Sequence, residues 1–289
     1  MPNVQKNPVL RPLMRSETLA EVAGMALLVG VYSGLAVWKE HSAYRDVGDV
    51  PPELHASLSL VLGLLLVFRT NAAYARWWEA RTLWGALVNA SRNLAAKFVT
   101  LTRVPREEVL AAGEMVIGFP YSLRDHLRSE PIHDIPVSVR RLVEEAEHKP
   151  GVITKRLYAY LGQWKELGQI DGDELRVIDR DLARLLDICG GCERILKTRI
   201  ARSYRSFARQ CVLLFLLTLP WCIVNAFHWW TIPLSAIIAY FMIGLEVVAE
   251  HVEEPFGHDE DDLDLDGLCE TIERTVNELL ETEPPKPVV

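Results

Sequence analysis

Four apolar blocks lie along the chain, two near each end, and charged stretches separate them. Residues 19–38 carry a single charge near their start and, as a helix, reach about 30 Å, the thickness of a bilayer's hydrocarbon core. Residues 54–68 are uncharged but too short to cross, so this helix must continue into the polar stretch RTNAAYAR. Residues 211–227 and 232–248 flank the sequence HWWTIP, which predicts a helical hairpin with an interfacial turn.

Between these blocks, residues 76–207 alternate apolar and charged positions at helical spacing, which predicts a cytosolic helical bundle. We expect breaks at Pro105, Pro120, Pro131, Pro136 and the Lys-Pro-Gly of 149–151. The predicted fold is therefore all-α, a four-span membrane protein with a cytosolic bundle.

The expected segments are 1–75 with two spans, 76–207 as the bundle, 208–250 as the hairpin and 251–289 as an acidic cytosolic end. A soluble protein with four buried helices is the alternative, because three of the blocks are shorter than about 20 residues.

Basic residues predict how the spans are oriented. They precede the first span, follow the second and precede the third, whereas the loop after the first span holds only Lys39 and Arg45. Loops rich in lysine and arginine stay in the cytoplasm, so both termini are expected inside the inner (plasma) membrane. The residues concerned are Lys6, Arg11, Arg15, Arg69, Arg76, Arg81, Arg92, Lys97, Lys197, Arg199, Arg202, Arg205 and Arg209.

Composition excludes several other classes of protein. A net charge of −8 argues against nucleic-acid binding, which needs a basic face. Five cysteines do not form a secreted disulfide framework, and the single CxxC at Cys189 and Cys192 lacks the context of a redox or zinc motif. No nucleotide, metalloprotease or nucleophile motif is present, so we expect no enzyme activity.

The second span carries the sharpest pattern. Leu60, Leu64 and Phe68 recur at four-residue steps and lie within about 80° of one another on a helix, with Ser57 and Asn71 nearby. Several copies of this helix around an axis would stack these side chains into apolar rings that gate ions by dewetting. Ordinary helix packing is the alternative explanation.

Three blocks resemble signatures of the bestrophin family: FRTNAAYARWWEARTLWG (68–85), CERILKT (192–198) and VVAEHVEEPFGHDEDDLDLDGLC (247–269). The resemblance covers most of the chain. It implies a ring-forming, homopentameric ion channel with one central pore, whose neck is lined by Leu60, Leu64 and Phe68. It also implies a second, cytosolic constriction, which we place at Ile178.

The acidic run of residues 258–266 offers carboxylates to a hard cation. The family resemblance assigns calcium ligation to Asp259 and Asp262, although Glu254 stands where animal members usually have asparagine and Leu263 interrupts the acids. A solvated loop that caps a helix starting near Leu265 is the alternative. No other cofactor is expected. Near the end of the fourth span, Glu246 and Glu250 should face water or a basic partner.

The leading prediction is passive conduction of monovalent ions across the bilayer by self-assembled chains, with chloride first. A Na⁺/K⁺ channel is the alternative, because an apolar neck selects no sign of charge and the chain is acidic. A membrane-anchored scaffold or regulatory protein is the alternative of another class.

Overall fold

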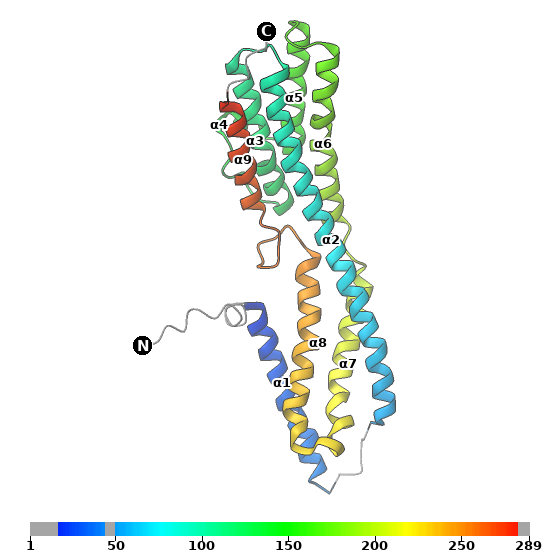
Figure 1. Cartoon of the computed structure of the whole chain (residues 1–289). Helices are drawn as coiled ribbons and strands as arrows, with labels where there is room; N and C mark the ends of the chain where they lie inside the picture. Colours follow the sequence, from blue (N-terminus) through cyan, green and yellow to red (C-terminus); the bar gives the residue numbers. More distant parts are fainter. Residues whose placement is uncertain (1–16, 44–49, 283–289) are drawn as a thin grey trace, which may run out of the picture. The chain divides into compact units, whose positions relative to one another are not determined.

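The computed structural model describes residues 17–43 and 50–282, and within these ranges all long regular elements are helices, which confirms the all-α prediction. Lys6, Arg11, Arg15 and Arg45, which contribute to the predicted orientation, lie outside the described residues. The elements, in chain order, are α1 (Glu17–Glu40), α2 (Pro52–Leu101), α3 (Arg106–Arg128), α4 (Val137–Val143), α5 (Lys149–Glu166), α6 (Gly172–Lys197), α7 (Arg202–Phe227), the 3₁₀ turn η2 (His228–Trp230), α8 (Thr231–Glu253) and α9 (Leu265–Glu281) (Figure 1).

The chain forms two compact units. The membrane unit, as we call it, contains α1, α2 up to Arg76, α7, η2 and α8; the bundle unit contains α2 from Trp77, α3 to α6 and α9. The expected boundary at residues 75/76 lies one residue from the boundary between the units, and both fall inside one continuous helix. Residues 199–207 group with the membrane unit, because α7 begins at Arg202.

In the membrane unit, α1 packs along α8, and α7 contacts both helices (Figure 1). Gly30 permits the close approach of α1 to α8, since a Cβ there would lie 3.1 Å from the Cβ of Ala236. The buried apolar cluster that joins the helices consists of Ala26, Leu62, Leu66, Val212, Phe215, Leu216, Leu219 and Ala239.

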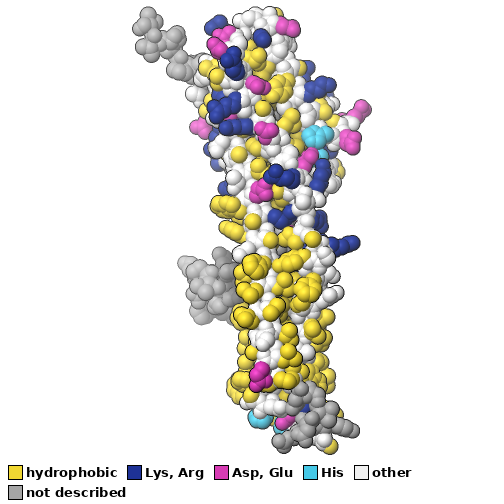
Figure 2. All heavy atoms as spheres, turned by 90° about the vertical axis from the view of Figure 1, so that its right-hand side faces the viewer, with side chains coloured by type: hydrophobic (Ala, Val, Ile, Leu, Met, Phe, Trp, Pro, Cys, Tyr) yellow, Lys and Arg dark blue, Asp and Glu magenta, His cyan; other side chains and the backbone are white. Residues whose placement is uncertain are grey.

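Among the described residues, three helical stretches that lie wholly or partly in this unit are long and apolar enough to cross a membrane: Thr18–Glu40, Pro52–Leu101 and Arg202–Glu253. The third reverses direction at η2, so it supplies two helices, α7 and α8, as the hairpin prediction expected. In the most apolar segment of each stretch, only 33%, 22% and 22%, respectively, is buried within the chain. The remaining apolar surface, visible as dense yellow over this unit in Figure 2, therefore needs lipid or neighbouring chains to cover it.

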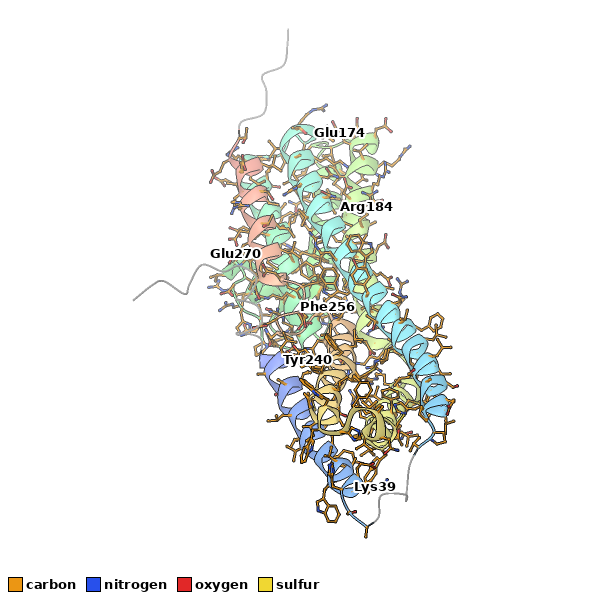
Figure 3. The ribbon with its side chains drawn as sticks, turned by 60° about the horizontal axis from the view of Figure 1, so that its bottom comes forward. Lys39, Glu174, Arg184, Tyr240, Phe256 and Glu270 are labelled. Atoms are coloured by element: carbon orange, nitrogen blue, oxygen red, sulfur yellow. The ribbon has the colours of Figure 1, made fainter. Side chains whose placement is uncertain are left out.

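The bundle unit has a closed core around α3, which contacts α4, α5, α6 and α9. Helix α6 begins with a capping box: the Asp171 carboxylate accepts from the Glu174 backbone N–H at 2.7 Å, and Glu174 Oε2 accepts from the Asp171 N–H at 2.8 Å. Figure 3 shows Glu174 at this end of α6, with Arg184 farther along the helix and Glu270 on α9. On the face that Figure 2 shows, most of the Lys, Arg, Asp and Glu side chains lie on this unit, among apolar and uncharged ones.

The prolines mark most, but not all, of the expected breaks. Pro105 and Pro136 occupy the N-cap positions of α3 and α4, and Pro150 lies in the first turn of α5. The break predicted at Pro120 is wrong, because α3 continues through it. The residues around Pro120 are buried against neighbouring helices, and this packing offsets the backbone hydrogen bond that the ring removes.

Candidate pore face and charged clusters

The predicted neck residues form a continuous exposed stripe on α2. Leu60, Leu64 and Phe68 are 69%, 53% and 65% exposed. The opposite side of the helix carries Leu62 and Leu66, which are buried in the membrane unit. Helix α2 thus turns one apolar side toward its own unit and leaves a second apolar side uncovered.

Polar side chains lie at both ends of this stripe. Ser57 and Asn71 are exposed and, at about 100° per residue, point within the same 80° sector as the three apolar residues. Glu53, in the first turn of α2, is exposed in that sector too. The Ser57 hydroxyl donates to the Glu53 backbone carbonyl at 3.0 Å. An apolar stripe with polar ends suits a path that opens to water on both sides better than a surface facing lipid along its whole length.

Directly after the stripe, Arg69 is buried and ion-paired. Its side chain is 1% exposed, and its Nε lies 2.9 Å from Glu246 Oε2 on α8, whose side chain is 8% exposed. Arg209 on α7 donates through Nε to the other oxygen of Glu246 at 3.2 Å and also pairs with Glu250. The two acids near the end of the fourth span therefore have basic partners, as expected. The resulting Arg–Glu–Arg–Glu chain connects α2, α7 and α8.

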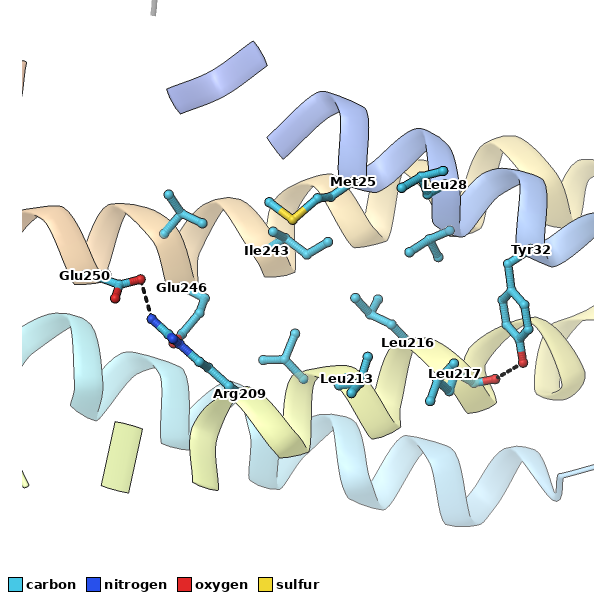
Figure 4. Close-up of a pocket in the computed structure, with 13 residues that line it drawn as sticks. Met25, Leu28, Tyr32, Arg209, Leu213, Leu216, Leu217, Ile243, Glu246 and Glu250 are labelled. Carbon is cyan, nitrogen blue, oxygen red and sulfur yellow. Dashed lines mark hydrogen bonds and ion pairs between the residues drawn. The ribbon is translucent and has the colours of Figure 1, made fainter. Parts of the chain in front are cut away.

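An apolar groove of about 640 Å³ begins at this cluster and runs between α1, α7 and α8. Figure 4 shows the Arg209–Glu250 pair at one end and Tyr32 at the other, where its hydroxyl donates to the Leu217 carbonyl at 2.9 Å. Between these ends, nearly all of the lining side chains are aliphatic. The groove is one of the apolar surfaces that this chain leaves uncovered by itself.

Ile178, the residue predicted for the cytosolic constriction, lies inside the bundle unit. Ile178 is 0% exposed and packs in the core of the bundle unit, so its side chain is not available to line a pore. The preceding residue on α6, Val177, is also apolar, and its side chain is 46% exposed at the surface of the bundle unit.

Part of the acidic run of residues 258–266 makes contacts that hold the fold together. Asp264 caps α9 by accepting from the Gly267 N–H at 2.9 Å. Asp266 accepts from Arg124 at 2.6 Å and from Arg128 at 3.0 Å; partial burial opposes its ionisation, but the two guanidinium groups outweigh burial and lower the pKa of Asp266. The second half of the run thus anchors α9, in agreement with the helix-capping alternative.

The predicted calcium ligands, Asp259 and Asp262, precede these anchoring residues in the acidic run. Two groups of three potential metal ligands occur among the described residues, and neither contains Asp259 or Asp262. Calcium ligation by these two aspartates stays a prediction.

The first of these groups lies in the bundle unit, where His126 Nε2 and His148 Nε2 are 2.8 Å and 3.0 Å from the same oxygen of Glu193. Burial acts to raise the pKa of Glu193, but the hydrogen bonds from His126, Lys197 and His148 lower it. Glu193 is therefore an anion with two imidazole partners.

Cys189, one turn before Glu193 on α6, points to the same cluster, with its Sγ 3.9 Å from His148 Nε2 and 4.0 Å from Glu193 Oε1. Its CxxC partner, Cys192, is buried as well, and both cysteines belong to the core of the bundle unit. Burial, followed by the charge of Glu193, raises the pKa of Cys189 to about 12, and burial raises the pKa of Cys192 as well. Both are protonated thiols at neutral pH, so the CxxC is not a reactive dithiol.

Sequence patterns alone missed two of these features. The Arg69–Glu246 pair brings together residues that are far apart in the sequence. The only sign of it in the sequence is that a charged residue lies at or next to the end of the second and the fourth predicted spans. The histidine cluster had one usable signal, the four-residue spacing of Cys189 and Glu193, which places both on one face of a helix.

Comparison with known proteins establishes the class. The family described as "Bacterial/Fungal Bestrophin protein" matches residues 5–278, nearly the whole sequence. The chain belongs to this bestrophin family.

Particular relatives agree with this assignment. The chain is 35% identical over 235 residues to a voltage-dependent anion channel-forming protein of Synechocystis, covering 78% of this chain and 76% of that protein. A protein of the same description from Mesorhizobium japonicum is 32% identical over 282 residues, with coverage of 96% and 90%. The fold matches the crystal structure of a point mutant of a bacterial bestrophin homologue from Klebsiella pneumoniae, with a TM-score of 0.85, 25% identity and coverage of 93% and 100%.

Proposed function

We propose that this protein assembles as a homopentamer in the bilayer and conducts monovalent ions passively, with anions preferred. Family membership and the names of the bacterial relatives support a channel rather than an enzyme, and those names support anions. The number five comes from the bestrophin resemblance. A ring is required on physical grounds as well, because one chain with a single uncovered stripe cannot enclose a path through lipid.

The observation that carries the proposal is the exposed stripe of α2. In a ring, five copies of Leu60, Leu64 and Phe68 stack into three apolar collars, with Ser57 before them and Asn71 after them. A narrow apolar collar excludes water when closed and lets ions pass when it widens and hydrates. The groups that would surround an ion on either side of the collars are polar.

A second collar belongs to the same proposal. We place it at Val177, because this side chain is exposed on α6 whereas Ile178 is enclosed in the core.

The proposed topology has four membrane crossings, by α1, the first part of α2, α7 and α8. The charged surface of the bundle unit suits the cytoplasm, and an even number of crossings leaves both termini on that side of the inner membrane.

Glu53 supports the alternative, a channel for monovalent cations. It is exposed at the start of α2, one turn from Ser57 in the same sector, so a ring would place five carboxylates at the mouth of the neck. Rings of acidic side chains attract cations and repel anions.

Purified protein in planar bilayers under a KCl gradient, without calcium, distinguishes these functions. We expect current that reverses near the chloride equilibrium potential, and native mass spectrometry of the same preparation should show five chains. Reversal near the potassium potential would establish the cation channel, and Glu53→Gln should then move the reversal potential toward chloride. A stable monomer without current would contradict both and favour the scaffold.

A further inference from the structure

Three parts of the bundle unit bring imidazole and carboxylate groups to one point that ion conduction does not use. His126 lies in the last turn of α3, His148 is the N-cap of α5 and Glu193 lies near the end of α6. Their closest ligand atoms all lie within 4.8 Å of one another. The Glu193 side chain is 18% exposed and that of His148 is 47% exposed, so the cluster is accessible from solvent.

A fourth potential ligand completes the arrangement. The Sγ of Cys189 lies 3.9 Å from His148 Nε2 and 4.0 Å from Glu193 Oε1. Ligand atoms at the tetrahedral bond lengths of zinc, about 2.0 to 2.3 Å, are separated by roughly 3.3 to 3.6 Å. The distances from Glu193 Oε1 to the two imidazoles, and from Cys189 Sγ to His148 Nε2 and Glu193 Oε1, lie within about 0.5 Å of these values. Cys189 lies outside the group of atoms that are all within 4.8 Å of one another, so its side chain must move toward His126 to share one ion with the other three.

We infer that His126, His148 and Glu193 bind a divalent transition-metal ion of the zinc class, with Cys189 as the fourth ligand. Two imidazoles, a carboxylate and a thiolate are donors that zinc prefers, whereas calcium and magnesium take oxygen ligands almost exclusively. Glu193 already carries its negative charge beside the two rings. Binding releases the Cys189 proton to solvent, since a metal-bound thiol is a thiolate.

The other three-residue group of this unit is a poorer metal site. The oxygens of Asp125 accept from Arg124 Nε at 2.7 Å and from the His133 backbone N–H at 2.8 Å. Glu130 pairs with His258 at 2.8 Å. The guanidinium of Arg124 disfavours a second cation beside Asp125, so this group serves as a control.

Metal binding also changes the start of α5. His148 Nδ1 now accepts from the Gly151 N–H at 3.0 Å, which places the ring proton on Nε2. Ligation through Nε2 moves that proton to Nδ1 and breaks this cap, a small loss beside the free energy of metal ligation. In return, the ion joins α3, α5 and α6 at one point, so we expect it to stabilise the bundle unit.

The test uses the full-length protein in detergent, stripped with a chelator and titrated with Zn²⁺ in a calorimeter. We expect one ion per chain. His148→Asn should weaken binding at least tenfold while keeping the fold, because asparagine is a good N-cap residue and replaces the lost cap. Glu193→Gln should weaken binding at least as much, and thermal melting of the metal-free variants checks their folding.

Cobalt substitution tests the fourth ligand. Co²⁺ in the wild-type protein should show the visible bands of tetrahedral coordination and a near-ultraviolet thiolate-to-cobalt band, which Cys189→Ser should lose and Cys192→Ser should retain. The inference is overturned if His148→Asn and Glu193→Gln bind Zn²⁺ as the wild type does, or if His133→Gln alone abolishes binding. A thiolate band that survives in Cys189→Ser overturns the assignment of Cys189.

Discussion

Channels in which Leu60, Leu64 and Phe68 are all alanine should pass at least about ten times the wild-type current at rest, which corresponds to lowering the barrier by about 1.4 kcal/mol. The three apolar collars are expected to hold the neck dehydrated in the closed state. Alanine widens each collar and reduces the apolar surface that excludes water. Single-channel recording in symmetric KCl measures the effect as a higher open probability or conductance.

Helix α1 offers a matched control. Leu27, Val31 and Leu35 are 67%, 69% and 55% exposed and recur at the same four-residue steps as the neck residues. Their replacement by alanine removes similar apolar surface from a helix that lies outside the proposed pore lining. Currents should then stay at the wild-type level. A large effect of the α1 changes, with none from the α2 changes, would show that the wrong helix has been assigned to the pore.

The second large effect concerns the buried Arg69–Glu246 ion pair, where Glu246→Gln should destabilise the protein more than Arg69→Met. Removing the Glu246 charge leaves Arg69 buried without a carboxylate, which costs about 3 to 5 kcal/mol for a fully buried pair. Removing Arg69 leaves Glu246 with a remaining partner, Arg209. The loss of stability should therefore be larger for Glu246→Gln, because Glu246 has two basic partners whereas Arg69 is paired with Glu246.

Thermal unfolding of the detergent-solubilised protein measures this order, and the double variant supplies the control. With Arg69→Met and Glu246→Gln together, no charge is buried alone and Arg209 keeps Glu250, so stability should recover relative to Glu246→Gln. Equal losses in the two single variants, or no recovery in the double variant, would mean that the pair is not the buried contact described here.

Sequence alone predicted the helices of the membrane unit well, because a long uncharged block bounded by charged residues forms a membrane-spanning or buried helix in most proteins. It placed the boundary between the two segments at residues 75/76, one residue from the boundary between the units, but it did not predict that α2 continues to Leu101. The change in composition near residue 75 suggested a boundary between domains, but a helix ends where its hydrogen bonds or backbone geometry end, not where its surroundings change. No proline interrupts α2 after its first turn, so the helix passes from one unit into the other.

The helical pattern of α6 also bears on the predicted constriction at Ile178. The helical spacing that predicted the bundle places Ile178, Leu182 and Leu185 on one face, and that face is the core. A residue that obeys the core pattern of its own chain is a poor candidate for a pore surface. Val177, about 100° around the helix, breaks the pattern and is exposed.

Tertiary partners were beyond sequence reasoning for a different reason. His126, His148 and Glu193 meet only after three helices have packed, and nothing local to any of them specifies the other two. The exposed apolar stripe of α2 was predictable because all its members lie on one helix, where spacing alone determines direction.

The claim that the exposed stripe of α2 lines the ion path is tested most directly by the reversal potential of channels with a charge at Leu64. The side chain is 53% exposed, so neither Leu64→Lys nor Leu64→Glu inserts a charge into the core of the chain. Under a KCl gradient, the lysine ring should move the reversal potential toward that of chloride and the glutamate ring toward that of potassium. Conducting channels whose reversal potential is the same in both variants and in the wild type would contradict the account.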